Sequence, residues 1–395
     1  MHKEKDIEDY YMSFTYLMGL LGGLALFLYG MQMMSTGLES AAGNKMKTIL
    51  EKLTANRFVG VLMGALITAI IQSSSATTVM VVGFVNSGMM SLRQAVWIIM
   101  GANIGTTITG QLIALDVGEL APLIAFFGVA AMVFIKNEKV KYVGEIFAGL
   151  GILFIGMDMM GSAMKPLAES EAFVSLLTKF ENPILGILAG TIFTAIIQSS
   201  SASVGILQAL AGSGAIGLSS AVYVLFGQNI GTCITALLAS VGTSRNAKRT
   251  TIIHIMFNVF GTIVFTILCL ATPLTSLIEG ITPGDAPKQI ANLHTMFNIV
   301  TTILLLPVGT FLTKIATFIL KDKNEDDGQA RTYHLVDIKR IHTEKLGASI
   351  ICMESIKKEL MRMLDMAKDN VHNAFDVFAK RDEAKHMEIA KKEEY

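Results

Sequence analysis

Charged residues are scarce in this chain of 395 residues, and they are unevenly spread. Asp, Glu, Lys and Arg make up 16% of the sequence, against about 25% in an ordinary soluble domain. Of these 64 residues, 31 lie in the last 75 positions, which leaves 33 for the first 320. A water-soluble globule needs charge on every surface element, so the first 320 residues are predicted to lie in a lipid bilayer.

Other residue types are too few for several functions. The three cysteines, Cys233, Cys269 and Cys352, lie far apart and provide neither a disulfide framework nor a zinc site. The formal net charge is zero, without the basic excess that is typical of nucleic-acid-binding proteins. The sequence contains no nucleophile–base pair, metal cluster or phosphate-binding loop. We therefore predict no enzyme, no cofactor and no nucleic-acid partner.

Long apolar stretches are what the sequence does contain. About 20 residues cross the hydrocarbon layer, and seven stretches match one crossing each: 14–36, 94–115, 119–135, 142–164, 219–240, 250–272 and 291–313. The stretches 58–90 and 183–218 are too long for one crossing and too short for two, and each carries a polar cluster at its middle. We predict that both are re-entrant helical hairpins whose tips reach the bilayer centre.

The placement of lysine and arginine supports the hairpins. With both stretches as hairpins, twelve Lys and Arg residues fall on one side of the membrane and five on the other. A cytoplasmic face shows such an excess. The N-terminus is then predicted outside the cell membrane and the charged tail in the cytoplasm.

The sequence repeats itself at an offset of 126 residues. Residues 68–109 align with 194–235 without a gap, and 21 of the 42 pairs are identical, including TAIIQSSSA at 68–76 and 194–202. The first unit contains three crossings, so the second begins on the opposite side. The prediction is an all-α polytopic membrane protein with an inverted repeat and broken helices, the architecture of secondary transporters. Its parts are repeat 1 (about 14–135), repeat 2 (about 142–272) and an extra span (291–313), within a transport domain over 14–314.

The polar clusters suit the binding of ions. Each Gln-Ser-Ser-Ser would lie between two half-helices, where N–H groups attract an anion and C=O groups attract a small cation. Gly105 and Gly231, within mid-span Asn-Ile-Gly-Thr segments, would permit local unwinding nearby. No Lys or Arg lies at the midplane, so an anion would need co-bound cations to neutralise it. This predicts coupling between the anion and the cations.

These motifs resemble the type II sodium–phosphate cotransporter family, whose hallmark is two repeats that each carry QSSS followed by Gly-x-Asn-Ile-Gly-Thr. The resemblance covers about 14–313. It implies that the anion is inorganic phosphate and that the driving ion is sodium, both held between the two hairpins. Together with hydroxyls one turn beyond the tips, the predicted site residues are Gln72, Ser73, Ser74, Ser75, Thr77, Asn103, Thr106, Gln198, Ser199, Ser200, Ser201, Ser203, Asn229 and Thr232. Cys233 departs from the pattern, since Thr107 is its counterpart.

Alternatives remain open. A passive or proton-coupled carrier or channel for a small oxyanion would use the same motifs, and a regulatory scaffold would only display the tail. His254 and Asn258, and again His294 and Asn298, form a second small repeat, for which we favour a structural role. The oligomeric state, monomer or homodimer, stays open.

The charged tail has its own pattern. Residues 321–341 are predicted to be a linker, and apolar residues from Leu346 to Phe378 recur at the spacing of an amphipathic helix. The stretch 342–395 resembles the start of the helical PhoU-like domain that bacterial members of the family carry. Asp365 and Asp369 match the carboxylates that bind metal in such bundles, but Lys368 between them favours a solvated face.

Overall fold

The structure, a computed structural model, describes residues 2–42, 56–115, 117–168 and 170–321, with scattered positions between 357 and 372. Side chains are described from residue 15 onward. The chain divides into two units, Met1–Asp322 and Lys323–Tyr395. Within the described residues, all regular structure is helical.

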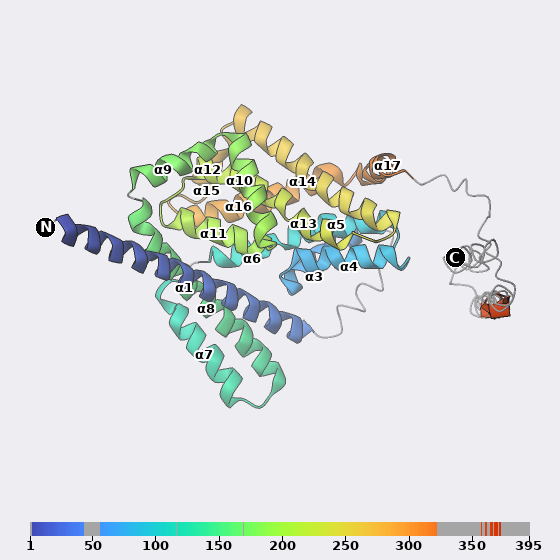
Figure 1. Cartoon of the computed structure of the whole chain (residues 1–395), viewed down its shortest axis with the longest axis horizontal. Helices are drawn as coiled ribbons and strands as arrows, with labels where there is room; N and C mark the ends of the chain where they lie inside the picture. Colours follow the sequence, from blue (N-terminus) through green and yellow to red (C-terminus); the bar gives the residue numbers. More distant parts are fainter. Residues whose placement is uncertain are drawn as a thin grey trace, which may run out of the picture. The chain divides into compact units, whose positions relative to one another are not determined.

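The first unit consists of short helices set among a few long ones (Figure 1). In chain order they are α1 (His2–Ala42), α3 (Arg57–Ile71), α4 (Ser74–Asn86), α5 (Leu92–Gly105), α6 (Thr107–Ile113), η1 (Gly118–Leu120), α7 (Ala121–Phe134), α8 (Glu138–Ala168), α9 (Glu171–Thr178), η2 (Lys179–Glu181), α10 (Pro183–Ile197), α11 (Ser200–Gly212), α12 (Leu218–Gly231), α13 (Cys233–Ala239), α14 (Arg245–Ala271), α15 (Leu274–Ile281), α16 (Ala286–Leu305) and α17 (Gly309–Ile319).

Among the described residues, five helical stretches are long and apolar enough to cross a membrane: Thr15–Ala41, Leu92–Ile113, Glu138–Pro166, Leu218–Ala239 and Arg245–Ala271. The number rises to seven if two bent helix pairs each count as one span. One of these pairs is α16 with α17, which meet at 84°, so the predicted span 291–313 contains a sharp break. The prediction of an all-α polytopic membrane protein is confirmed.

The two QSSS segments each join a pair of helices that fold back on each other. α3 runs parallel to α5, because Gly101 faces Val61 and Gly105 faces Ala65 at the same register. α4 follows α3 after only Gln72 and Ser73, and a short turn then leads into α5. α4 must therefore run in the opposite direction, as the hydrogen bond from Thr68 Oγ1 to Thr77 Oγ1 (3.0 Å) across the hairpin also shows. The pair α10–α11 repeats this geometry against α12.

Local sequence explains where these helices begin and end. Asn56 and Asn182, 126 residues apart, cap α3 and α10 by accepting hydrogen bonds from two backbone N–H groups each. Both helices end at a glutamine in the left-handed conformation, Gln72 (φ 57°) and Gln198 (φ 59°). The serine that follows each glutamine then caps the second helix of the hairpin.

The two repeats are related by a pseudo-two-fold axis. A side chain at Gly30 would overlap the backbone of Leu153, and one at Gly156 would overlap the backbone of Phe27. Gly156 and Leu153 are the repeat counterparts of Gly30 and Phe27, so the contacts between α1 and α8 are reciprocal, as a two-fold axis requires. These two helices are antiparallel, which places the axis perpendicular to them. The two repeats therefore run in opposite directions relative to each other.

The helices are interrupted directly after Gly105 and Gly231, since α5 ends at Gly105 and α6 begins at Thr107, while α12 ends at Gly231 and α13 begins at Cys233. The interruption does not use a backbone conformation that only glycine can adopt. Both glycines have negative φ, and Thr106 and Thr232 keep helical dihedral angles (φ −65° and −57°). A side chain at Gly105 would instead overlap the backbone oxygen of Ala65. The glycines are needed because the helices that they belong to pack against the first arm of each hairpin at backbone distance.

Few residues of the second unit are described. Leu360, Leu364 and Val371 are helical and at least 58% exposed, and Asp365 and Asp369 are also exposed. The rest of the predicted linker and of the PhoU-like helices lies outside the described residues.

Candidate functional site

The two hairpin tips meet in the interior of the first unit. Ser74 Oγ lies 3.4 Å from Ser200 Oγ, and these two serines are repeat counterparts. Thr106 Oγ1, from the end of α5, lies 3.3 Å from the same Ser200 hydroxyl. All three side chains are at most 9% exposed. The pseudo-two-fold axis therefore passes between the tips and brings both QSSS segments to one point.

A second pair of contacts ties each tip to the opposite repeat. Ser201 Oγ donates to Thr109 Oγ1 at 3.3 Å, and Thr235 Oγ1 donates to Ser75 Oγ at 3.1 Å. Ser75 and Ser201 are counterparts, and so are Thr109 and Thr235. The site is thus a set of seven hydroxyl groups, four from the first repeat and three from the second.

Two helix N-termini meet at this point. α4 begins at Ser74 and α11 at Ser200, each with 13 residues and no acidic residue in its first turn. A helix N-terminus carries about half a positive charge, and here two of them face each other across a single hydroxyl–hydroxyl contact. Such ends bind oxyanions through their unpaired N–H groups and adjacent hydroxyls. The arrangement suits an anion without any basic side chain.

The glutamines at the two tips differ in burial. Gln72 is 6% exposed, accepts a hydrogen bond from Thr109 Oγ1 at 2.7 Å and donates one to the Ala69 carbonyl. Gln198 has the same backbone conformation but is exposed, and no hydrogen bond joins its side chain to a described residue. The difference is confined to the glutamines, because the next residues differ in the opposite sense: Ser201 and Ala202 are buried, whereas Ser75 is half-buried and Ala76 is exposed.

Several predicted site residues lie close to the tips but bond within their own repeat. Ser73 and Ser199 act as helix caps, Thr77 and Thr232 bond to backbone carbonyls, and Asn103 Nδ2 donates to the Ile99 carbonyl at 2.8 Å. Ser203 is fully buried, and its hydroxyl has no partner among the described residues. These side chains form the layer behind the contact between the tips.

Asn229 connects the second repeat to α16. Its Oδ1 lies 3.1 Å from His294 Nε2, and Asn298 Nδ2 donates to the His294 carbonyl. Its counterpart Asn103 has no such contact to another helix among the described residues. One of the two predicted His–Asn pairs therefore touches a motif residue.

The other His–Asn pair does not touch a motif residue. His254 is 1% exposed, and its ring nitrogens have no partner among the described residues. Asn258 Nδ2 donates to Cys233 Sγ at 3.3 Å. The thiol that replaces a threonine in the second repeat is thus held by α14, away from the tips.

Our sequence interpretation missed Thr109 and Thr235, which join the tips across the repeats. A signal for them exists, because both lie in the repeated Ile-Gly-Thr-x-Ile-Thr segment, with Thr109 at the same offset of 126 from Thr235. Our prediction included only the preceding Thr106 and Thr232, because the family motif ends at these residues.

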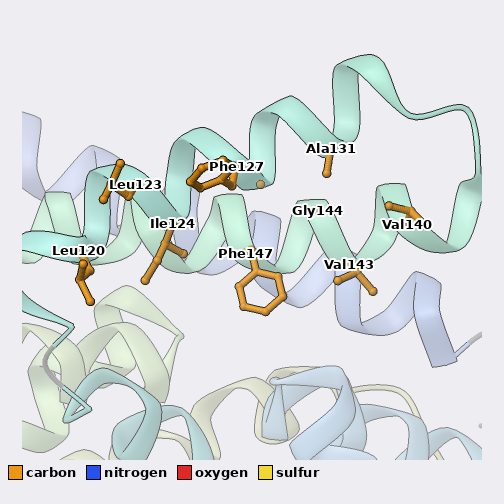
Figure 2. Close-up of a pocket in the computed structure, with 10 residues that line it drawn as sticks. Leu120, Leu123, Ile124, Phe127, Ala131, Val140, Val143, Gly144 and Phe147 are labelled. Atoms are coloured by element: carbon orange, nitrogen blue, oxygen red, sulfur yellow. The ribbon is translucent and has the colours of Figure 1, made fainter.

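An apolar groove between α7 and α8 has a different chemistry (Figure 2). It has a volume of about 390 Å³, and its lining includes Leu123, Phe127, Val143 and Phe147. Figure 2 shows only hydrocarbon side chains along it. With no polar group to orient an ion, this groove suits an apolar ligand rather than phosphate.

Comparison with known proteins agrees with the repeat. A sequence profile of the Na+/Pi-cotransporter family matches residues 26–162 and matches again at residues 156–280. The chain belongs to the Na+/Pi-cotransporter family. The two matches follow the two repeats, and the family consists of phosphate transporters rather than enzymes. The predicted resemblance is thereby confirmed.

Relatives of the chain include bacterial and animal proteins. It is 34% identical over 301 residues to the protein YqeW of Bacillus subtilis, a match that covers 76% of the chain and 97% of YqeW. It is 26% identical over 359 residues to YjbB of Salmonella typhimurium, provisionally named an inorganic phosphate export protein, with 90% of the chain and 65% of YjbB covered. Sodium-dependent phosphate transport protein 2A of Rattus norvegicus is 36% identical over 98 residues, 24% of the chain and 15% of that protein. No solved structure matches the chain.

Proposed function

We propose that this protein is a sodium-coupled carrier of inorganic phosphate in the cell membrane, and that phosphate binds between the two QSSS tips. One observation carries the proposal: the N-termini of α4 and α11 meet through Ser74 and Ser200, 3.4 Å apart. Two helix N-termini and at least four hydroxyls converge there from both repeats. A tetrahedral oxyanion can accept hydrogen bonds from both sides of such a site.

Sodium coupling follows from what the tips lack. No basic side chain contributes to the contacts at the tips, so two half-charges from helix ends face an anion that carries one to two negative charges. The first arms of the hairpins end nearby at Gln72 and Gln198, where carbonyl and amide oxygens are suitable ligands for a small cation. A co-bound sodium ion would balance the remaining charge. The relatives' names, sodium-dependent transport and phosphate export, agree with a carrier that runs in either direction along its gradients.

The mechanism requires that the two tips separate. In the structure the serine hydroxyls satisfy one another, so phosphate replaces the Ser74–Ser200 contact when it binds. We propose that the hairpins enter the membrane from opposite sides, as the inverted repeat implies. Opening at one tip while the other stays closed would then expose phosphate to one side at a time.

Uptake of labelled phosphate into proteoliposomes tests the proposal. We expect an inward sodium gradient to drive uptake, and a potassium gradient to fail. Replacing both contact serines, Ser74→Ala with Ser200→Ala, should lower the initial rate at least tenfold, because charge-assisted hydrogen bonds to phosphate are lost. Ser87→Ala with Ser213→Ala is the matched control, since these repeat-related serines bond only within their own hairpin.

Two results would contradict the proposal. Unchanged uptake in the Ser74→Ala, Ser200→Ala variant would show that phosphate does not bind at the tips. Uptake driven equally well by a proton gradient without sodium would replace sodium with protons as the coupling ion.

A further inference from the structure

A polar pocket lies at the end of the first hairpin that is farthest from the tip. It has a volume of about 420 Å³. Its walls come from the start of α3 (Asn56, Arg57), the start of α5 (Arg93, Trp97) and the break between α16 and α17 (Pro307, Thr310). α3 has 15 residues, so Gln72 lies about 22 Å along the helix from this pocket. The pocket is therefore separate from the site at the tips.

The pocket is strongly cationic. Arg57 and Arg93 both line it, and the lining contains no acidic residue. Neither guanidinium group forms an ion pair with a described residue, and Arg57 lies over the Phe58 ring at 5.7 Å. Guanidinium groups bind phosphate oxygens through parallel N–H donors. Two of them on one cavity leave a positive charge that an anion would balance.

Two helix ends add to this positive charge, and a buried indole forms part of the wall. α3 and α5 both start at the pocket, so two helix N-termini contribute partial positive charge. Trp97 is 2% exposed, and its indole N–H has no hydrogen-bond partner among the described residues. A buried donor without a partner is costly. The nitrogen is also shielded from the cavity, so Trp97 forms part of the pocket wall and is not a donor to a ligand there.

The second repeat shows that the fold does not need these arginines. At the offset of 126, Arg57 corresponds to Pro183, Arg93 to Ser219 and Trp97 to Tyr223. Ser219 Oγ there donates to Glu181 at 3.0 Å, so an acidic group takes the place of the cationic pair. The same helices form in both halves. The positive-inside rule explains basic residues on one side of the membrane, but it does not require two arginines to share one cavity.

We propose that this pocket binds a phosphate group other than the transported one. A phospholipid headgroup is the expected source, because Phe58 and Leu62 on the adjoining face of α3 are 64% and 66% exposed and continue the apolar surface of the helix. Acyl chains can lie along that face while the headgroup binds Arg57 and Arg93. Inorganic phosphate offers the same oxygens, so the two sources must be separated by experiment.

Trp97 provides a local probe, since it is the single tryptophan of the chain. The full-length protein is placed in phosphatidylcholine nanodiscs, and its indole emission is followed while short-chain phosphatidylglycerol or, separately, inorganic phosphate is added. We expect a saturable change with phosphatidylglycerol. Arg57→Gln and Arg93→Gln should each weaken it about tenfold, and the double variant should abolish it.

Controls separate the pocket from general surface charge and from the tips. Lys139→Gln with Lys141→Gln removes two exposed positive charges near the start of α8 and should leave the titration unchanged. Ser74→Ala with Ser200→Ala should also leave it unchanged, whatever happens to transport. Circular dichroism of each variant confirms that the helices remain folded.

Each outcome of the titration either supports or overturns the proposed phosphate site. Saturation by inorganic phosphate alone, lost in the double arginine variant, supports the site and identifies the free ion as its ligand. No saturable change with either ligand, or a change that the double arginine variant retains, overturns the proposal.

Discussion

The two hairpin tips share nine consecutive residues but differ in their surroundings. Gln72 and Gln198 have nearly the same backbone angles, yet Gln72 is 6% exposed and bonded to Thr109, while Gln198 is exposed. The local sequence thus produces the same turn twice. What covers each turn depends on helices that are distant in sequence. A carrier that opens to one side at a time needs such unequal halves.

The far ends of the hairpins differ even in sequence. Arg57, Arg93 and Trp97 in the first half stand where the second half has Pro183, Ser219 and Tyr223. The two halves are therefore alike in their helix contacts and in the backbone of their tips. They differ in the charge at the far ends of the hairpins and in the exposure of the tip glutamines. Four predictions test this division, from the largest expected effect to the smallest.

Larger side chains at the close helix contacts should destabilise the fold equally in both halves. A side chain at Gly101 would overlap the Val61 carbonyl, and one at its counterpart Gly227 would overlap the Ile187 carbonyl. We expect Gly101→Val and Gly227→Val each to destabilise the fold by at least about 3 kcal/mol, because a backbone cannot move aside as a side chain can. Thermal unfolding in detergent measures this.

Gly83→Ala is the control for the glycine variants. Nothing lies within 4 Å of the added carbon, and the second repeat already has Ala209 at this position. Alanine should leave stability unchanged or raise it by up to about 1 kcal/mol. If one of the two valine variants were tolerated, the helix packing would not be symmetric.

The hydroxyl links between the repeats should not be equivalent. Thr109→Val removes the donor to buried Gln72 and the acceptor of Ser201, and leaves a buried amide oxygen unpaired. We expect a loss of about 1–3 kcal/mol in unfolding free energy. Thr235→Val removes the bond to half-buried Ser75 and should cost less. Equal shifts in melting temperature for the two variants would show that the burial of Gln72 does not increase the stability lost when its hydrogen bond is removed.

Access to the two tips should differ about tenfold or more. In separate variants, Gln72→Cys and Gln198→Cys, a small maleimide should modify position 198 faster, because that side chain is exposed. The unmodified chain gives the background rate, and its Cys233 is buried. Labelling rates are measured by mass spectrometry of the intact protein. Equal rates would indicate that both tips open together.

The smallest expected effect concerns the helix caps. Asn56 and Asn182 each accept hydrogen bonds from two backbone N–H groups at the start of their helices, at 2.9–3.4 Å and 3.0–3.3 Å. Asn56→Ala and Asn182→Ala should each cost about 1 kcal/mol in unfolding free energy. If a lipid phosphate binds near Asn56, phosphatidylglycerol should reduce the loss of unfolding free energy in Asn56→Ala. It should not change the loss in Asn182→Ala. A cost at one cap alone would contradict the symmetry of the hairpins.

Much of the fold could be read from the sequence because the relevant signals are local. Hydropathy locates α1, α8 and α14, and the offset of 126 identifies the repeats. Ser73 and Ser199 mark the start of the second hairpin arms. Gly105, where α5 ends, shows the limit of such reasoning. A glycine inside a helix reads the same whether it unwinds the helix or lets another helix approach, and only the neighbouring helix distinguishes the two.

The sequence by itself determined the class of the protein, its duplication and the turn at each QSSS segment, since all three depend on residues close in the chain. Only the tertiary structure decided that Ser74 touches Ser200, that Gln72 is covered while Gln198 is not, and that Arg57 and Arg93 share a pocket with Trp97. The reason is that burial and electrostatic potential are set by helices packed from distant parts of the sequence. Two identical segments in different surroundings therefore acquire different properties.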